Sequence, residues 1–153
     1  MSNLLIAIDP GKNGGIAEAE FVGGVEIMAH AISMPETAHD LVEYLESIQQ
    51  CSYDHVCCVV ERVHSMPQDG AASAFAFGEN FGMLQGVLAA VKIPYRFVTP
   101  QQWQKKVGAL PKDKAERKRA LKAFAQQRYP KLKVTLKTAD ALAMLAVEGA
   151  TER

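Results

Sequence analysis

Five apolar stretches along the chain are each long enough for a β-strand but too short for a stable helix. The first, Leu4 to Ile8, ends at Asp9 and is followed by a Pro-Gly pair, which marks the end of a buried strand. The same pattern predicts strands over residues 3–9, 15–21, 24–32, 55–61 and 94–98. Gly23 and Gly24 predict a tight turn between the second and third strands, so we expect the sheet to begin as an antiparallel meander.

Apolar residues recur at helical spacing between and after these strands. Leu41, Val42, Leu45 and Ile48, for example, would share one helix face. The pattern predicts helices over residues 36–50, 73–91, 101–107, 112–128 and 138–150. Together the elements predict an α/β fold with a mixed five-stranded sheet flanked by helices, formed as a single domain over residues 1–153.

The helix predicted over residues 73–91 carries a regular row of glycines. Gly78, Gly82 and Gly86 recur every four residues, so one face of this helix has no side chains. In an aqueous protein such a face usually permits close packing on a sheet or on another helix. We therefore expect this face to be packed.

Composition indicates an ordinary globular domain. The chain has 153 residues, 48% hydrophobic and 22% charged, which is enough for a core that needs neither disulfides nor metal to fold. No apolar run approaches the length of a membrane span, and no charged-then-apolar signal precedes the first strand, so we expect a soluble, cytoplasmic protein. The three cysteines, Cys51, Cys57 and Cys58, lack metal-ligand spacing and are expected to be buried thiols.

Three acidic residues stand at the edges of apolar elements. Asp9 and Glu61 each end a predicted strand, and Asp140 begins a predicted helix among small residues. Each has an ordinary explanation when taken alone: a turn residue, a salt-bridged strand end, or a helix N-terminal acid favoured by the helix dipole. Taken together, they fit a site for hard cations, which prefer oxygen ligands. Carboxylates at the edge of a dry core also need such a partner to remain charged.

These motifs resemble those of the RuvC-type Holliday-junction resolvases, in the ribonuclease H-like nuclease superfamily. The resemblance rests on Ile8-Asp9-Pro10-Gly11, on Val60-Glu61, on the helix from Gly78 to Ala90 and on Ala139-Asp140-Ala141-Leu142-Ala143, in that order and over nearly the whole chain. It implies a homodimer that makes paired, symmetric nicks in four-way DNA junctions. It also implies that Asp9, Glu61 and Asp140 are catalytic and hold Mg²⁺, for which Mn²⁺ would substitute.

Charge is distributed very unevenly along the chain, although the net charge is zero. Residues 92–137 contain fourteen lysines and arginines against only Asp113 and Glu116, whereas residues 1–91 contain Lys12 and Arg62 against twelve acids. A charge run is usually just a solvated face. This one precedes the third carboxylate, and a basic surface beside an acidic metal site would suit phosphodiester cleavage.

The basic segment contains the candidate DNA contacts. The resemblance places a catalytic lysine at Lys114, counted from Gly108, and a second at Lys105 or Lys106. The remaining candidates in the segment are Lys112, Lys118 and Lys137. Trp103 could stack on an unpaired base, but its helical spacing beside Val107 favours a core position.

Two positions depart from the family pattern. The family usually has a fourth metal ligand, Asp or His, one helical turn before the last Asp, whereas this chain has Lys137 there. A charged lysine cannot ligate a metal, so another residue or water replaces it, or Lys137 contacts the scissile phosphate. Three residues after Glu61, the family often has an aromatic residue that stacks in the junction centre. His64 occupies that position and could stack on a base or simply be solvated.

Other functions remain open from the sequence. The chain could be a branched-DNA-binding module that does not cleave, or an endonuclease that also accepts forks, flaps or three-way junctions. Asp-Pro-Gly-Lys-Asn-Gly-Gly also resembles a phosphate-binding hairpin of actin-like phosphotransferases. Those proteins need two such domains around a nucleotide, so we expect no nucleotide cofactor.

Overall fold

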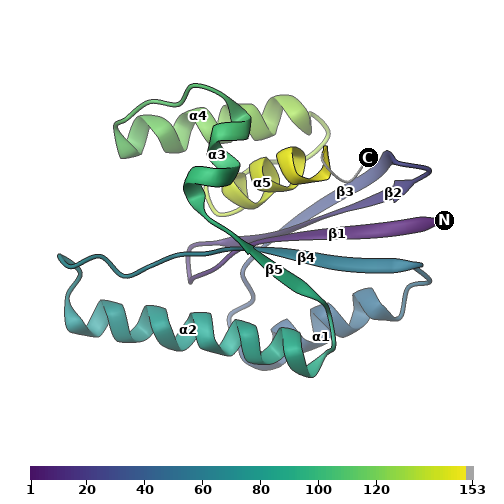
Figure 1. The fold of residues 1–153 in the computed structure, drawn as a ribbon, viewed down its shortest axis with the longest axis horizontal. Helices are drawn as coiled ribbons and strands as arrows, with labels where there is room; N and C mark the ends of the chain where they lie inside the picture. The colour runs from purple at the N-terminus through teal and green to yellow at the C-terminus, as the bar shows by residue number, and fades with distance from the viewer. Residues whose placement is uncertain (151–153) are drawn as a thin grey trace.

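The fold is a central sheet covered by helices on both faces (Figure 1). The computed structural model describes residues 1–150. The strands are β1 (Ser2–Asp9), β2 (Gly15–Val22), β3 (Val25–Ser33), β4 (His55–Glu61) and β5 (Tyr95–Val98). The helices are α1 (Ala38–Gln49), α2 (Ala71–Ala90), α3 (Pro100–Val107), α4 (Lys114–Arg128) and α5 (Ala139–Gly149). Every predicted strand and helix is present, and the ends differ from the predicted ones by at most two residues.

The five strands lie in the order β3-β2-β1-β4-β5. β1, β2 and β3 pair antiparallel, as the predicted meander requires, and both glycines of the turn have positive φ (59° and 79°). β4 and β5 then pair parallel, with β4 beside β1. The chain therefore forms the mixed five-stranded sheet that was predicted.

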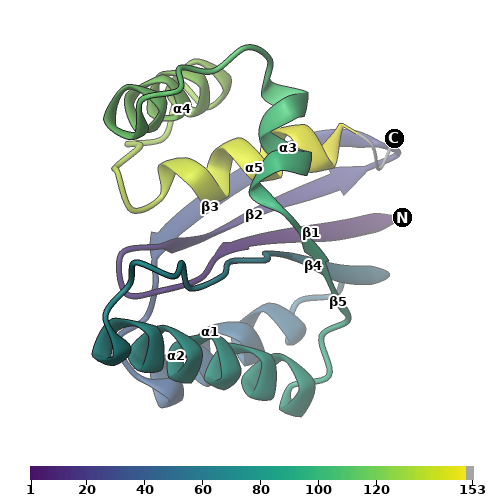
Figure 2. The same ribbon diagram turned by 60° about the vertical axis from the view of Figure 1, so that its left-hand side comes forward.

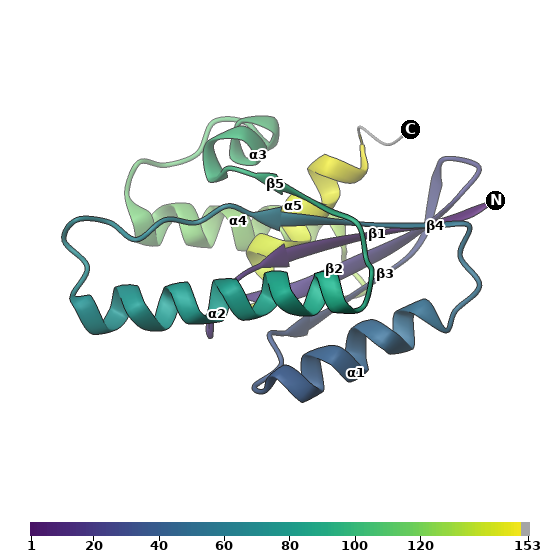
Figure 3. The same cartoon turned by 60° about the horizontal axis from the view of Figure 1, so that its bottom comes forward.

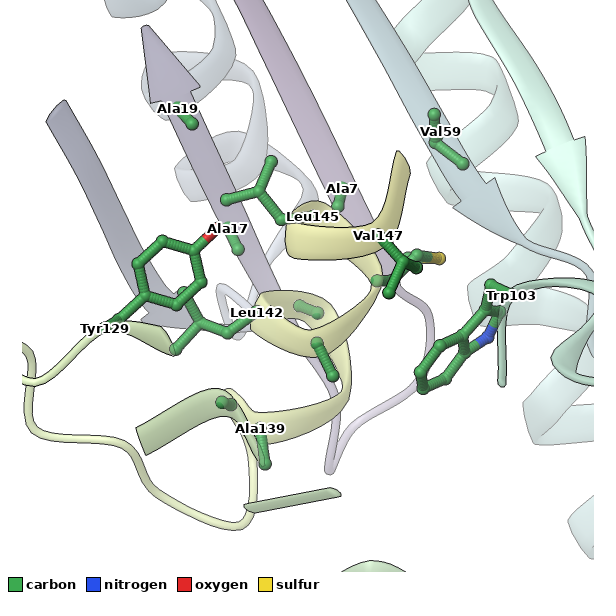
Figure 4. Packing of buried hydrophobic residues seen from close by; sticks show 14 of the residues in the cluster. Ala7, Ala17, Ala19, Val59, Trp103, Tyr129, Ala139, Leu142, Leu145 and Val147 are labelled. Carbon is green, nitrogen blue, oxygen red and sulfur yellow. The ribbon is translucent and has the colours of Figure 1, made fainter. Parts of the chain in front are cut away.

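The helices form two layers. Figures 1 and 2 show α1 and α2 on one face of the sheet and α3, α4 and α5 on the other. Alternate residues of β1 serve the two layers: Ile6 and Ile8 pack with Leu84 of α2, whereas Leu5 and Ala7 pack with Leu142 of α5. Figure 4 shows the core on the α5 side, which combines seven alanines with larger apolar residues and includes Trp103.

Capping explains where two helices begin later than predicted. The Thr37 side chain accepts a hydrogen bond from the backbone N–H of Asp40, so Thr37 is the N-cap and α1 starts at Ala38. In the same way Asp113 accepts from the N–H of Glu116 and α4 starts at Lys114. The polar residues at these ends cap the helices instead of joining them.

One packing prediction was wrong and one was confirmed. A Cβ added at Gly78, Gly82 or Gly86 would meet nothing within 4 Å, so this face of α2 is open in the single chain and its packing against another helix stays a prediction. Cys51 is exposed, although Cys58 is buried as expected. Trp103 is fully buried, which confirms its core position and removes it as a base-stacking surface. No helix of residues 1–150 is long and apolar enough to cross a membrane.

Candidate functional site

The three predicted acids meet at one edge of the sheet. β1 and β4 are parallel neighbours with Ile8 opposite Val60, so Asp9 and Glu61 leave the sheet side by side. Their neighbours Ile8 and Val60 belong to the α1–α2 core, and strand alternation therefore turns both carboxylates toward the α5 layer. Asp140 lies there, in the first turn of α5. Asp9 and Glu61 are buried, with 9% and 7% of their surface exposed.

A glycine allows the chain before α5 to approach this edge. A Cβ on Gly15, the first residue of β2, would lie 2.7 Å from the carbonyl oxygen of Lys137 and 2.8 Å from that of Ile32. No residue with a side chain fits that space without moving backbone. The absence of a side chain at Gly15 thus helps to bring the α5 N-terminus, and Asp140 with it, close to Asp9.

Glu61 is held by a neutral donor from a neighbouring helix. The indole Nε1–H of Trp103 donates to Oε2 of Glu61 at 2.5 Å. Trp103 lies on α3, a short helix that begins with a complete capping box formed by Thr99 and Gln102. The buried carboxylate of Glu148, on α5, accepts from Lys106 of α3 at 2.8 Å. The position of Trp103 is therefore fixed from both ends of its helix.

Asp140 has a different partner, a lysine from α4. Lys118 Nζ lies 3.0 Å from Oδ2 of Asp140. The other oxygen, Oδ1, is buried and has no hydrogen-bond partner in residues 1–150. A buried carboxylate oxygen without a donor is costly, and it marks a place where a cation or water would be favourable.

The electrostatics of the cluster also favour a bound cation. Burial, and then the nearby charges of Glu61 and Asp140, raise the pKa of Asp9 well above its usual value. Burial raises the pKa of Glu61 to about 7, against the lowering effect of the Trp103 hydrogen bond. The charge of Lys118 lowers the pKa of both groups, against these effects. The three carboxylates thus interact with one another and carry more negative charge than Lys118 offsets.

The chemistry of the donor set fits a divalent metal, but the side chains would have to rearrange to bind one. As the side chains stand, residues 1–150 contain no ready-made group of three or more His, Cys, Asp or Glu residues that could hold a metal ion. Glu61 is turned to Trp103 and Asp140 to Lys118. The unpartnered Oδ1 of Asp140 and the raised pKa of Asp9 indicate that Lys118 does not fully compensate the carboxylates. Hard divalent cations take such oxygen ligands.

The basic candidates lie in three different settings. Lys118 lies at the acids, whereas Lys114 is exposed one turn earlier, at the start of α4. Lys106 forms an ion pair with Glu148, so its charge is already compensated within the protein. The other three lysines are exposed: Lys105, Lys112 and Lys137. His64 is exposed in the loop between β4 and α2, which lies at the same end of the molecule as the α3–α4 connection and the end of β1 (Figures 1 and 3).

Sequence reasoning missed the two contacts that hold the acids. Trp103 was expected in the core, but its hydrogen bond to Glu61 was not foreseen. The available signal was general: a buried indole N–H needs an acceptor. Lys118 was one cation among many, and nothing in the spacing separated it from Lys114.

Comparison with solved structures identifies proteins of similar fold. The chain resembles T. thermophilus RuvC in complex with a Holliday junction substrate, with a TM-score of 0.60, 16% sequence identity, and coverage of 98% of this chain and 94% of that one. A second structure of Thermus thermophilus RuvC gives a TM-score of 0.55 at 18% identity, over 96% and 97% of the two chains. No protein-family model and no curated protein sequence matches the chain. The chain therefore has the ribonuclease H-like fold of RuvC.

Proposed function

We propose that this protein is a divalent-metal-dependent endonuclease that resolves four-way DNA junctions by paired nicks. The observation that carries the proposal is the meeting of three carboxylates from three separate elements, one of them with an unpartnered buried oxygen, in a RuvC-like fold. RuvC with this fold binds a Holliday junction substrate. A substrate of the same kind explains why a chain of zero net charge concentrates its basic residues in one segment.

Asp9, Glu61 and Asp140 would hold the metal, Mg²⁺ with Mn²⁺ as a substitute. When bound, such a metal supplies Lewis acidity and an activated water for phosphodiester hydrolysis. Asp9 and Glu61 are fixed at the ends of adjacent strands, and they orient the reaction relative to the rigid sheet. Asp140 would act as a ligand once its ion pair with Lys118 is released, and the free ammonium would offset charge that builds on the phosphate.

The exposed lysines would bind the DNA backbone. Lys114 and Lys112 lie at the start of α4, Lys105 lies on α3, and Lys137 lies just before α5. Contacts to phosphates position DNA without reading sequence, so selectivity would come chiefly from junction shape. His64 contacts bases at the junction centre in this proposal. Lys106 contributes through its ion pair with Glu148, which keeps α3 in place.

A homodimer would supply the second nick. The α2 face with Gly78, Gly82 and Gly86 is uncovered, and Phe75 on the same helix is 73% exposed. Close approach of two such helices would bury apolar surface and relate two active sites by a two-fold axis. Paired, symmetric nicks follow from that symmetry.

The main alternative is a junction-binding protein that does not cleave. Lys137 stands where the resemblance expects a fourth metal ligand, and Lys118 occupies one oxygen of Asp140. Both observations would be explained if the acids no longer bound metal. A second alternative within the nuclease class is cleavage of forks, flaps or three-way junctions.

The test uses a labelled mobile four-way junction, a fork and a linear duplex of the same sequences. The wild-type protein is incubated with each in Mg²⁺, in Mn²⁺ and in EDTA, and both nicking and binding are recorded. Metal-dependent paired nicks confined to the junction support the proposal. Tight binding without nicks in either metal contradicts it and supports the binding module, and equal cutting of the fork supports broader specificity.

Two variants complete this test. Asp9→Asn removes a charge from the cluster and should abolish nicking while junction binding persists. Glu46→Gln makes the same kind of change at an exposed position of α1 and should leave both properties unchanged. Nicking that survives in Asp9→Asn would point to a contaminating nuclease.

A further inference from the structure

A cavity lies at the end of the sheet where β1 ends, on its α2 side. Its volume is about 490 Å³, within the range of small-ligand sites. Four segments form its walls: the β1–β2 turn, the end of β3 with the connection to α1, the middle of α2, and the residue two positions before α5. Of the residues that line it, only Lys137 has been given a functional role above.

Two of the segments that line the cavity also carry acids of the cluster. Lys12 follows Asp9 by three residues, in a turn closed by a hydrogen bond from the Gly14 N–H to the Gly11 carbonyl. Lys137 precedes Asp140 by three residues. The same two segments thus carry two of the three acids and one wall each of the cavity. The cavity and the acids therefore lie at the same end of the sheet, on its two sides.

The charge at the cavity is unusual for its half of the chain. Residues 1–91 contain only two basic residues, and one of them, Lys12, lines the cavity. Lys137 supplies a second ammonium from the far end of the sequence, and Glu36 is the acid in the lining. Two lysines placed together where the surrounding sequence is acidic favour a phosphate group.

The rest of the lining has the chemistry of a nucleobase site. Met34 and Met83 offer flat, polarisable thioether surfaces against which a base can lie. Asn80 offers an amide, which can donate to and accept from the edge of a base. Phosphate-binding cations, apolar surface and one amide are the elements of a nucleotide site.

We propose that this cavity is a nucleotide subsite that receives the nucleotide next to the scissile phosphate and sets the sequence preference of cleavage. The inference rests on the proposed nuclease function and extends it. Lys12 and Lys137 hold the phosphate that flanks the cleaved bond, the methionines contact the base, and Asn80 reads its edge. The lysine at position 137 then has a role in place of metal ligation.

The first experiment measures sequence preference. Junctions with a randomised core are nicked by the wild-type protein, by Asn80→Ala, by Lys12→Ala and by Gln50→Ala, whose amide is exposed at the end of α1 away from the cavity. The nicked ends are then sequenced. We expect one preferred base beside the nick in the wild-type and Gln50→Ala products, and a preference about tenfold weaker with Asn80→Ala. Lys12→Ala should slow nicking and keep the preference. An unchanged preference in Asn80→Ala would overturn the subsite.

The second experiment does not need cleavage. In EDTA, binding is measured for junctions that carry a single abasic nucleotide at each position of the core in turn. The subsite predicts one position where loss of the base weakens wild-type binding but not binding by Asn80→Ala. Identical abasic profiles for both proteins would refute the subsite. If the wild-type protein showed the Asn80-dependent position but never nicked, the subsite would stand and the proposed cleavage would fail.

Discussion

Glu61 and Asp140 lie in the same cluster but are held in opposite ways. Glu61 accepts from the neutral, fully buried indole of Trp103 on a capped helix, so its charge is oriented without being neutralised. Asp140 pairs with the ammonium of Lys118, a flexible side chain that is 36% exposed. One half of the cluster is therefore fixed by the fold, and the other half is exchangeable. A site of this kind can be preassembled around Asp9 and Glu61 and completed only when a cation displaces Lys118.

Removal of either charge tests the comparison most strongly. Glu61→Gln and Asp140→Asn should each lower the nicking rate by roughly a thousandfold, because several kcal/mol of transition-state stabilisation are lost. Their effects on stability should differ. Glu61→Gln removes a buried charge that has no cationic partner, so the Tm in EDTA should rise. Asp140→Asn leaves Lys118 without its partner, so the Tm should not rise.

Thermal unfolding followed by circular dichroism measures this difference, with Glu46→Gln as the control for a surface charge change. If the Tm rose equally in both variants, the contrast between the two carboxylates would be wrong.

The structure and the family resemblance assign the catalytic lysine differently: the structure places Lys118 at the acids, whereas the resemblance favours Lys114. Lys118 touches Asp140 and acts electrostatically on Asp9 and Glu61, whereas Lys114 is exposed. We expect Lys118→Met to lower nicking by roughly a hundredfold, in the range found for one stabilising group at a transition state. Lys114→Met, which removes a single phosphate contact, should lower it about tenfold and should also reduce the salt dependence of junction binding.

Single-turnover rates on a saturating junction measure both variants. Lys118→Arg tests charge alone, and it should recover part of the rate. The reverse ranking, with Lys114→Met the more damaged, would return the catalytic role to Lys114.

The sequence predicted the strands, the helices and the three acids because those features depend on local patterns. A strand that ends in Asp9 or Glu61 can be recognised from about eight consecutive residues. The partners of the acids depend instead on how α3 and α4 pack over the sheet. Lys118 lies 22 residues from Asp140 and Trp103 lies 42 from Glu61, and no local pattern records such contacts. The open face of α2 has the same limit, since a row of glycines does not say whether its partner is in the same chain.

Trp103→Phe tests the fixed half of the cluster. Phenylalanine keeps most of the buried ring but removes the donor to Glu61. Partners that orient a ligand typically contribute 10–100-fold in metal affinity, so we expect Mn²⁺ binding to weaken by about tenfold or more. Calorimetric titration of Mn²⁺ into the free protein measures this without cleavage.

Tyr129→Phe is the matched control, because it removes a polar atom from another buried aromatic of the same core. It should leave Mn²⁺ affinity unchanged. Equal losses in the two variants would show that Trp103 acts only by packing.

The smallest expected effect is a pH dependence of stability without metal. The pKa of Glu61 is about 7 in the folded protein and about 4.5 when unfolded, and the pKa of Asp9 is also raised. Between these values the folded state binds more protons than the unfolded state, so stability falls as pH rises. In EDTA the Tm should therefore be several degrees lower at pH 8 than at pH 5.5. The lowered pKa of Glu148 affects stability only at more acidic pH.

Glu61→Gln should make this Tm difference smaller, and Asp140→Asn should reduce it less, because Lys118 already compensates Asp140. Saturating Mg²⁺ should raise the Tm at pH 8 more than at pH 5.5, since a cation binds the deprotonated carboxylates of the folded state. A Tm that is independent of pH in EDTA, or a Mg²⁺ effect that is the same at both pH values, would mean that Glu61 is not the uncompensated charge of the cluster. In that case a cation other than the neutral Trp103 donor would have to compensate the charge of Glu61 in the folded protein.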